Sequence, residues 1–137
     1  IEPVKEAMDT IELASGRREE VIDITAEVER LVARSGVQNG LCVVFVPHTT
    51  AAVTINENAD PNVRADILTA LRKAVPETLD YAHGEGNSPA HVKATMVGAS
   101  VTVPVALGRL KLGTWQGVQF YEFDGPRRRQ VWVLVLD

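Results

Sequence analysis

The sequence predicts an α+β protein, built on a largely antiparallel β-sheet with about three short helices. The first observation is the order of patterns, which runs from strands to a helix, to strands, to two helices and to strands again. The second is that each expected helix begins at a capping residue or at a residue followed by proline. The third is the dominance of β-branched and apolar runs beyond residue 100. At 137 residues, one domain spanning 1–137 is expected.

The first quarter of the chain contains two strand patterns and one helix pattern. Residues 8–13 alternate apolar and polar side chains, and residues 21–24 form a second apolar run after a charged turn, which predicts a β-hairpin. Thr25 is suited to cap the helix predicted over 26–35, and Gly36 is suited to end it. Two further strands are then expected, over 41–46 and 51–55.

The remaining helices are predicted by paired start signals. Asp60 and Pro61 begin a helix that should end near Val75–Pro76. Ser88 and Pro89 begin a shorter helix whose buried face is expected to hold Val92, Met96 and Ala99. Three strands complete the pattern, over 101–105, 118–123 and 131–136.

The last strand, 131–136, has no polar residue on either face. Both faces therefore need covering, and three short helices provide little cover. We expect a homo-oligomer. The alternative is a central strand in a well-wrapped monomer.

Composition excludes several classes of protein. A net charge of −4 and a pI of about 5.4 argue against a nucleic-acid partner. No apolar run approaches the roughly 20 residues that span a bilayer, and no signal peptide is visible, so no membrane partner is expected. The single cysteine, Cys42, lies in an apolar run, which favours a reducing compartment and a cytoplasmic location. Because the sequence begins at Ile1, we expect native residues to precede it.

The three histidines lie in two polar segments, one at His48 and one spanning His83 to His91. Imidazole is a common ligand of divalent metals. Spacing alone matches no closed zinc motif and favours structural roles for all three histidines. The arginines at 127–129 are expected at a solvated hairpin tip. The chain lacks a P-loop, G-x-S-x-G, H-E-x-x-H and Cys-x-x-Cys.

Four strings resemble the YjbQ family, in order and across essentially the whole chain. They are Pro47–Ala51, Ile55–Asp60, His83–His91 and Leu112–Gly117, the last followed by Glu122 and Gly125–Arg127. The resemblance implies a small α+β fold assembled as a homotrimer. It also implies a transferase, a thiamine-phosphate synthase that joins an aminopyrimidine diphosphate to a thiazole phosphate.

The resemblance also implies roles for individual residues. A divalent metal would be held by His48, His83 and His91. The catalytic candidates are Glu57, Asp60, Glu85, Asn87, Gln116 and Glu122. Binding of a phosphorylated small-molecule substrate would involve Thr49, Thr50, Trp115 and Arg127.

Two other functions remain open from the residues. The same ligands could serve a metal-dependent hydrolase of a small metabolite, with the metal activating a water. Alternatively, the protein is a trimer that binds a metabolite or a metal without turnover. Substrate profiling distinguishes the synthase from the hydrolase. Ligand binding without turnover identifies the non-catalytic binding protein.

Overall fold

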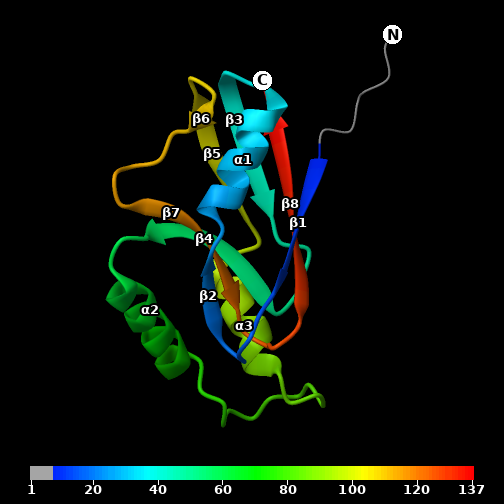
Figure 1. Cartoon of the computed structure of the whole chain (residues 1–137). Helices are drawn as coiled ribbons and strands as arrows, with labels where there is room; N and C mark the ends of the chain where they lie inside the picture. The colour runs from blue at the N-terminus through cyan, green and yellow to red at the C-terminus, as the bar shows by residue number, and fades with distance from the viewer. Residues whose placement is uncertain (1–7) are drawn as a thin grey trace.

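Eight strands and three helices lie in residues 8–137, the part of the chain that the computed structural model describes (Figure 1). The strands form two antiparallel sheets, as the α+β prediction requires. The five-stranded sheet has the order β1 (Met8–Ala14), β8 (Arg128–Leu136), β3 (Asn39–Phe45), β5 (Ser100–Ala106) and β6 (Arg109–Leu110). The three-stranded sheet has the order β2 (Glu20–Asp23), β7 (Gln116–Glu122) and β4 (Ala51–Glu57). The prediction of one domain over 1–137 stays a prediction, and residues 1–7 lie outside the described part.

The predicted hairpin over 8–24 is wrong. β1 pairs with β8, whereas β2 pairs with β7, so the two strands belong to different sheets. The charged turn between them carries the chain from one sheet to the other. Local alternation predicted both strands but gave no information on their partners, because strand pairing is decided by packing over the whole fold.

The helices lie close to their predicted positions but differ in detail. α1 spans Thr25–Ser35, and Thr25 is its first residue rather than its cap, with Ile24 in the cap position. α2 spans Pro61–Ala74 and begins as predicted, with the Asp60 side chain accepting a hydrogen bond from the Asn62 amide over 2.9 Å. α3 spans Ser88–Val97.

The buried face of α3 is not the predicted one. Lys93 and Ala94 are buried, whereas Val92 and Met96 are 39% and 55% exposed. Small side chains on the buried face let α3 approach Ala52, Tyr121 and Phe123 of the three-stranded sheet and the segment after it.

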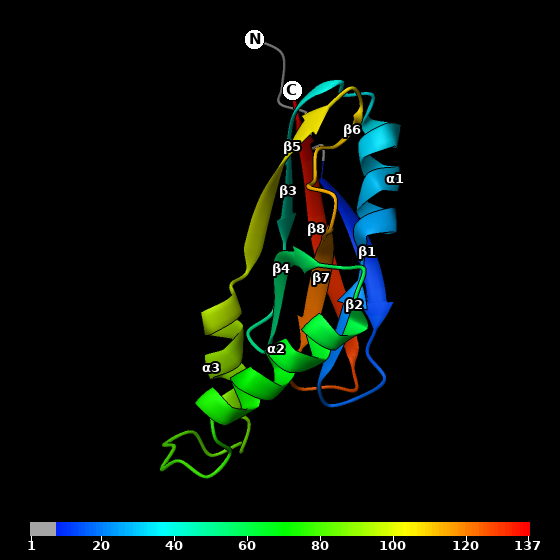
Figure 2. The same cartoon turned by 90° about the vertical axis from the view of Figure 1, so that its left-hand side faces the viewer.

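The core lies between the inner faces of the two sheets and α1, and it includes Val28, Val44, Phe120 and Val133. Cys42 is free and fully buried in it, and burial raises the pKa of its thiol to about 11. Figure 2 shows α1 and α3 on opposite sides of the strands, with α2 and α3 both near the lower ends of the strands. α2 has no buried residue. None of the helices in residues 8–137 has the length and apolar character to cross a membrane.

Candidate functional site

The predicted site residues fall into two groups at opposite ends of the β4–β7 ladder. Ala51 lies opposite Glu122 at one end, and Glu57 lies opposite Gln116 at the other. Six strand steps separate the ends, which is about 20 Å. The histidines belong to the Ala51 end. Glu57, Asp60, Trp115 and Gln116 belong to the other end, so one chain does not bring all of the predicted residues together.

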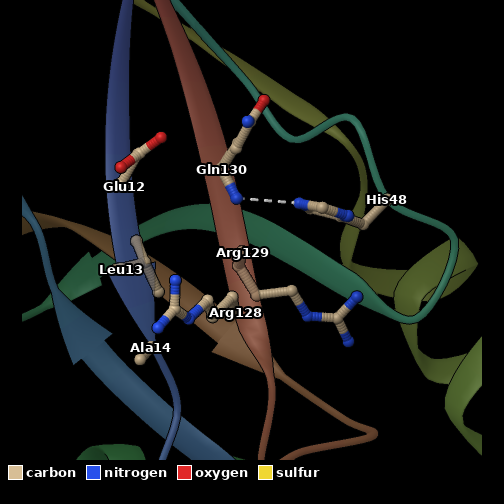
Figure 3. A pocket seen from close by; sticks show the side chains of 7 residues that line it. All are labelled: Glu12, Leu13, Ala14, His48, Arg128, Arg129 and Gln130. Atoms are coloured by element: carbon tan, nitrogen blue, oxygen red, sulfur yellow. Dashed lines mark hydrogen bonds between the residues drawn. The ribbon is translucent and has the colours of Figure 1, made fainter.

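His48 lies in the loop between β3 and β4 and contacts β8. On the β3 side, β8 is paired from Trp132 to Leu136 only. The amide of Gln130 therefore lies beyond the pairing with β3. This amide donates a hydrogen bond to Nε2 of His48 over 2.9 Å (Figure 3). An accepting Nε2 assigns the ring as the neutral tautomer with its proton on Nδ1. Burial and the positive charge of Arg129 lower the pKa of His48, which favours this neutral form.

His48 lines two cavities. One, of about 540 Å³, has Glu12, Arg128 and Gln130 in its wall (Figure 3). The other, of about 420 Å³, has Thr49 and His91 in its wall. His48 therefore separates a region that contains arginine from a region that contains a second histidine.

His91 and His83 are neighbours. His91 lies in the first turn of α3 and His83 in the loop before it, and their rings meet edge to face with centroids 5.4 Å apart. A carboxylate oxygen of Glu85 lies 3.8 Å from Nε2 of His83. The glycine-rich loop thus folds back so that His83 reaches the helix.

A buried polar network lies beneath His48. Glu122 is fully buried and accepts hydrogen bonds from Ser15, from the amide of Asp124 and from Arg129. Arg129 also donates to the hydroxyl of Thr50 over 2.8 Å. Burial alone would raise the pKa of Glu122, but the hydrogen bonds from Arg129 and Ser15 outweigh burial and hold this pKa below its usual value. Glu122 is therefore shielded from solvent, and its partner Arg129 lines the cavity beside His48.

A second polar cluster joins the loop before α3 to the segment after β7. Asn87 donates to the carboxylate of Asp124 over 2.9 Å, and Arg127 donates to the same carboxylate over 3.0 Å. The Oδ1 atom of Asn87 is buried without a hydrogen-bond partner. Arg127 and Asn87 thus fix the loop that carries His83.

The distal group has local structural contacts. Glu57 accepts from the amide of Ala59, Asp60 caps α2, and Gln116 accepts from the amide of Gly113. Trp115 is 64% exposed. These contacts shape the loops at the far end of the ladder.

Comparison with known proteins shows how this chain is related to others. The model of a protein family described as UPF0047 protein YjbQ-like matches residues 9–137. The chain belongs to this family. It is 47% identical over 131 residues to the UPF0047 protein YugU of Bacillus subtilis, a match covering 94% of this chain and 98% of YugU. It is 46% identical over 125 residues to a UPF0047 protein of Methanocaldococcus jannaschii, covering 91% of each.

Solved structures of the family have the same fold. A YjbQ/UPF0047 protein of Clostridium acetobutylicum superimposes with a TM-score of 0.92 at 52% identity, covering 93% of this chain and 99% of that one. A protein of Sulfolobus solfataricus superimposes with a TM-score of 0.90 at 38% identity, covering 93% and 94%. The predicted fold class is therefore confirmed.

The predicted thiamine-phosphate synthase activity is contradicted by the same comparison. The related proteins are named only as members of an uncharacterised family, and the Sulfolobus protein is described as being of unknown function. The family resemblance is correct, but the synthase function attached to it is wrong for this chain.

The described residues of this YjbQ-like chain do not bring three metal-ligand side chains together. Residues 8–137 contain no group of three or more His, Cys, Asp and Glu side chains placed to hold a metal ion. His83 and His91 lie together, whereas the lone pair on Nε2 of His48 is used by Gln130. The geometry thus fits two imidazole ligands from one chain.

Sequence reasoning missed the arginines of β8. Arg129 was expected at a solvated tip, but it lies within β8 and is 4% exposed. A signal was present, because alternation along a strand places Arg129 on the same face as Val131 and Val133. The opposite face carries Arg128 and Gln130 into the cavity beside His48.

Proposed function

We propose that this YjbQ-like protein binds a divalent metal ion through His83 and His91. The observation that carries the proposal is the contact of the two rings, with centroids 5.4 Å apart. A tetrahedral metal bound to two imidazole nitrogens at about 2.0–2.1 Å places the ring centroids about 5 Å apart. The carboxylate of Glu85 lies 3.8 Å from Nε2 of His83 and adds negative charge beside the two rings, which favours a cation there.

The remaining metal positions would be taken by water or by a bound molecule. Two protein ligands leave a metal open to an oxygen ligand such as a phosphate. We propose that this molecule is small and phosphorylated. The guanidinium of Arg128, in the wall of the cavity next to His48, supplies charge for a phosphate. The neutral ring of His48 offers the proton on Nδ1 as a further donor.

We also propose that the protein assembles as a homotrimer through the outer face of the five-stranded sheet. Leu41, Val43 and Phe45 of β3 lie opposite Leu136, Leu134 and Trp132 of β8. Leu41, Phe45 and Leu136 are 41–46% exposed, and the Phe45 and Trp132 rings stack with centroids 5.9 Å apart. A continuous apolar face of this kind is typical of a protein interface. The family resemblance implies three chains.

The experiment is a metal analysis by mass spectrometry of freshly purified protein. His83→Ala and His91→Ala should each lose most of the bound metal, because a metal with one imidazole from the chain binds weakly. His48→Asn is the matched control and should retain its metal. Circular dichroism establishes that each variant is folded. Full metal content in both of the first two variants would contradict the metal proposal.

The phosphate part is tested separately, on metal-loaded protein. Calorimetry should show that metal-loaded protein binds glycerol phosphate more strongly than metal-free protein, and this metal-dependent part of the binding should weaken in Arg128→Ala. If glycerol phosphate binds equally strongly with and without metal, its phosphate does not bind at the histidines.

A further inference from the structure

A second polar groove lies away from the histidines, between the β1–β2 turn, α2 and α3. It consists of two cavities of about 630 Å³ and 540 Å³ that share Arg17, Glu19 and Arg72 in their walls. These walls have no residue in common with the two cavities that His48 lines. The groove is therefore a separate candidate site.

Positive charge gathers in this groove although the whole chain has a net charge of −4. Its walls hold five basic side chains: Arg17, Arg18, Arg64, Arg72 and Lys93. They hold three carboxylates: Glu19, Glu20 and Glu77. Five positive charges less three negative charges leave a surplus of two. A phosphate monoester, at about −1.5 to −2 near pH 7, balances that surplus.

Glu19 holds two of these basic groups in place. Lys93 donates to one oxygen of Glu19 over 2.8 Å, and Arg72 donates to the other over 2.5 Å. The side chain of Lys93 is 3% exposed and that of Glu19 is 11% exposed. Burial alone would raise the pKa of Glu19, but the hydrogen bonds from Lys93 and Arg72 outweigh it and lower this pKa. Glu19 therefore stays ionised and anchors both cations.

Lys93 and Arg72 both line the wall of the larger cavity and have N–H groups beyond those that bind Glu19. The hydrogen bond to Glu19 uses one of the three N–H groups of Lys93 and one of the five of Arg72. Arg17 and Arg18 lie in the turn between β1 and β2, with side chains 79% and 59% exposed, and they form surface ion pairs with Glu20 over 3.9 Å and Glu77 over 3.4 Å. Anchored cations at the base and exposed arginines at the rim, whose surface ion pairs are weak, suit a phosphate group, because guanidinium binds phosphate through paired N–H donors.

We propose that this groove binds the phosphate group of a small molecule, at a site independent of the histidines. Lys93 and Arg72 contact the phosphate from the base of the groove, and Arg17 and Arg18 close over it. The ligand is either inorganic phosphate or a phosphate monoester, which have the same terminal group. This inference goes beyond the proposed metal-linked function and does not depend on it.

The test uses the full chain, freed of metal, so that a phosphate on a metal at the histidines does not contribute. Inorganic phosphate and glycerol phosphate are titrated separately, with binding followed by calorimetry. The double variant Arg17→Ala/Arg18→Ala should weaken binding roughly tenfold or more, because hydrogen bonds to charged groups are lost. Glycerol phosphate that binds as well as phosphate indicates a monoester ligand, whereas binding of inorganic phosphate alone indicates the free ion.

The matched control is Arg30→Ala/Arg34→Ala, which removes the same charge from exposed positions on α1. It should change the affinity less than about twofold. Because Lys93→Met alone leaves one oxygen of the largely buried Glu19 carboxylate without its hydrogen bond, a second double variant, Lys93→Met/Glu19→Gln, removes both charges. It should fold and also lose phosphate binding. Unchanged affinity in Arg17→Ala/Arg18→Ala, or an equal loss in the control, would overturn the proposal.

Discussion

Glu122 and Arg129 form an ion pair that is shut off from solvent, with side chains 0% and 3% exposed. Nε of Arg129 donates to one carboxylate oxygen over 2.8 Å, and a second guanidinium nitrogen donates to the other. The pair joins the end of β7 to the start of β8, directly beneath His48. It therefore connects the two sheets at the point where the candidate site lies.

Removing one partner of this pair should strongly destabilise the protein. We expect Glu122→Gln to lower the free energy of unfolding by about 3–5 kcal/mol, because it leaves the buried charge of Arg129 uncompensated. Guanidinium chloride denaturation measures the change. Arg128→Ala, at the neighbouring exposed position, is the control and should change stability by no more than about 0.5 kcal/mol. A loss below about 1 kcal/mol in Glu122→Gln would mean that the network relaxes around the change.

The contact between His48 and Gln130 should be sensitive to acid. Because burial and Arg129 lower the pKa of His48, its neutral ring stabilises the fold above the usual histidine pKa of about 6.5. This contribution is lost as the pH falls from about 6.5 through the lower pKa of the folded state. An NMR titration should give His48 a pKa below 6.5.

The pH dependence of the free energy of unfolding tests the same prediction when the titrating ring of His48 is removed. Between pH 7.5 and pH 5.5, His48→Gln should lose less free energy of unfolding than the unmodified protein, since other titrating groups act equally on both. An equal loss would show that protonation of His48 does not oppose folding.

Charge placed on the outer face of the five-stranded sheet should disrupt the proposed assembly. In sedimentation velocity, the unmodified protein should have three times the 14.9 kDa mass of one chain, and Trp132→Glu should sediment as a monomer. The control is Leu107→Glu, a similar change at a residue that is 85% exposed but lies in the β5–β6 turn. A monomeric unmodified protein would contradict the trimer, and a trimeric Trp132→Glu would place the interface elsewhere.

A methyl group at Gly40 should not fit. A Cβ atom there would lie 1.9 Å from the backbone carbonyl oxygen of Leu136, and backbone in a sheet cannot move aside cheaply. We expect Gly40→Ala to lower the free energy of unfolding by about 1–3 kcal/mol or more. Gly84→Ala, where a Cβ meets nothing within 4 Å, should leave stability nearly unchanged. Thermal denaturation of the two variants, followed by circular dichroism, makes the comparison, and equal midpoints would contradict it.

Much of the local structure could be predicted from the sequence because its causes are local. Asp60 and Pro61 predict the start of α2. The Asp60 carboxylate can accept a hydrogen bond from a free amide of the first turn, and proline fits the first helical position, where a backbone N–H has no partner within the helix. Alternating and β-branched runs predict seven of the eight strands in the described residues, and miss only the two-residue β6. The family strings likewise predict the fold, because they occur in the family's order between Pro47 and Arg127, over most of the chain.

Only the tertiary structure decided which of these elements meet. Period-two alternation is the same whether β2 pairs with β1 or with β7, so the false hairpin was not detectable locally. The register of β4 on β7 separates Glu57 from the histidines, and this register is set by packing of both sheet faces. The cationic groove arises in the same way. Arg72 and Lys93 are far apart in sequence, and they meet because both donate hydrogen bonds to Glu19, whose charge compensates for the burial of Lys93.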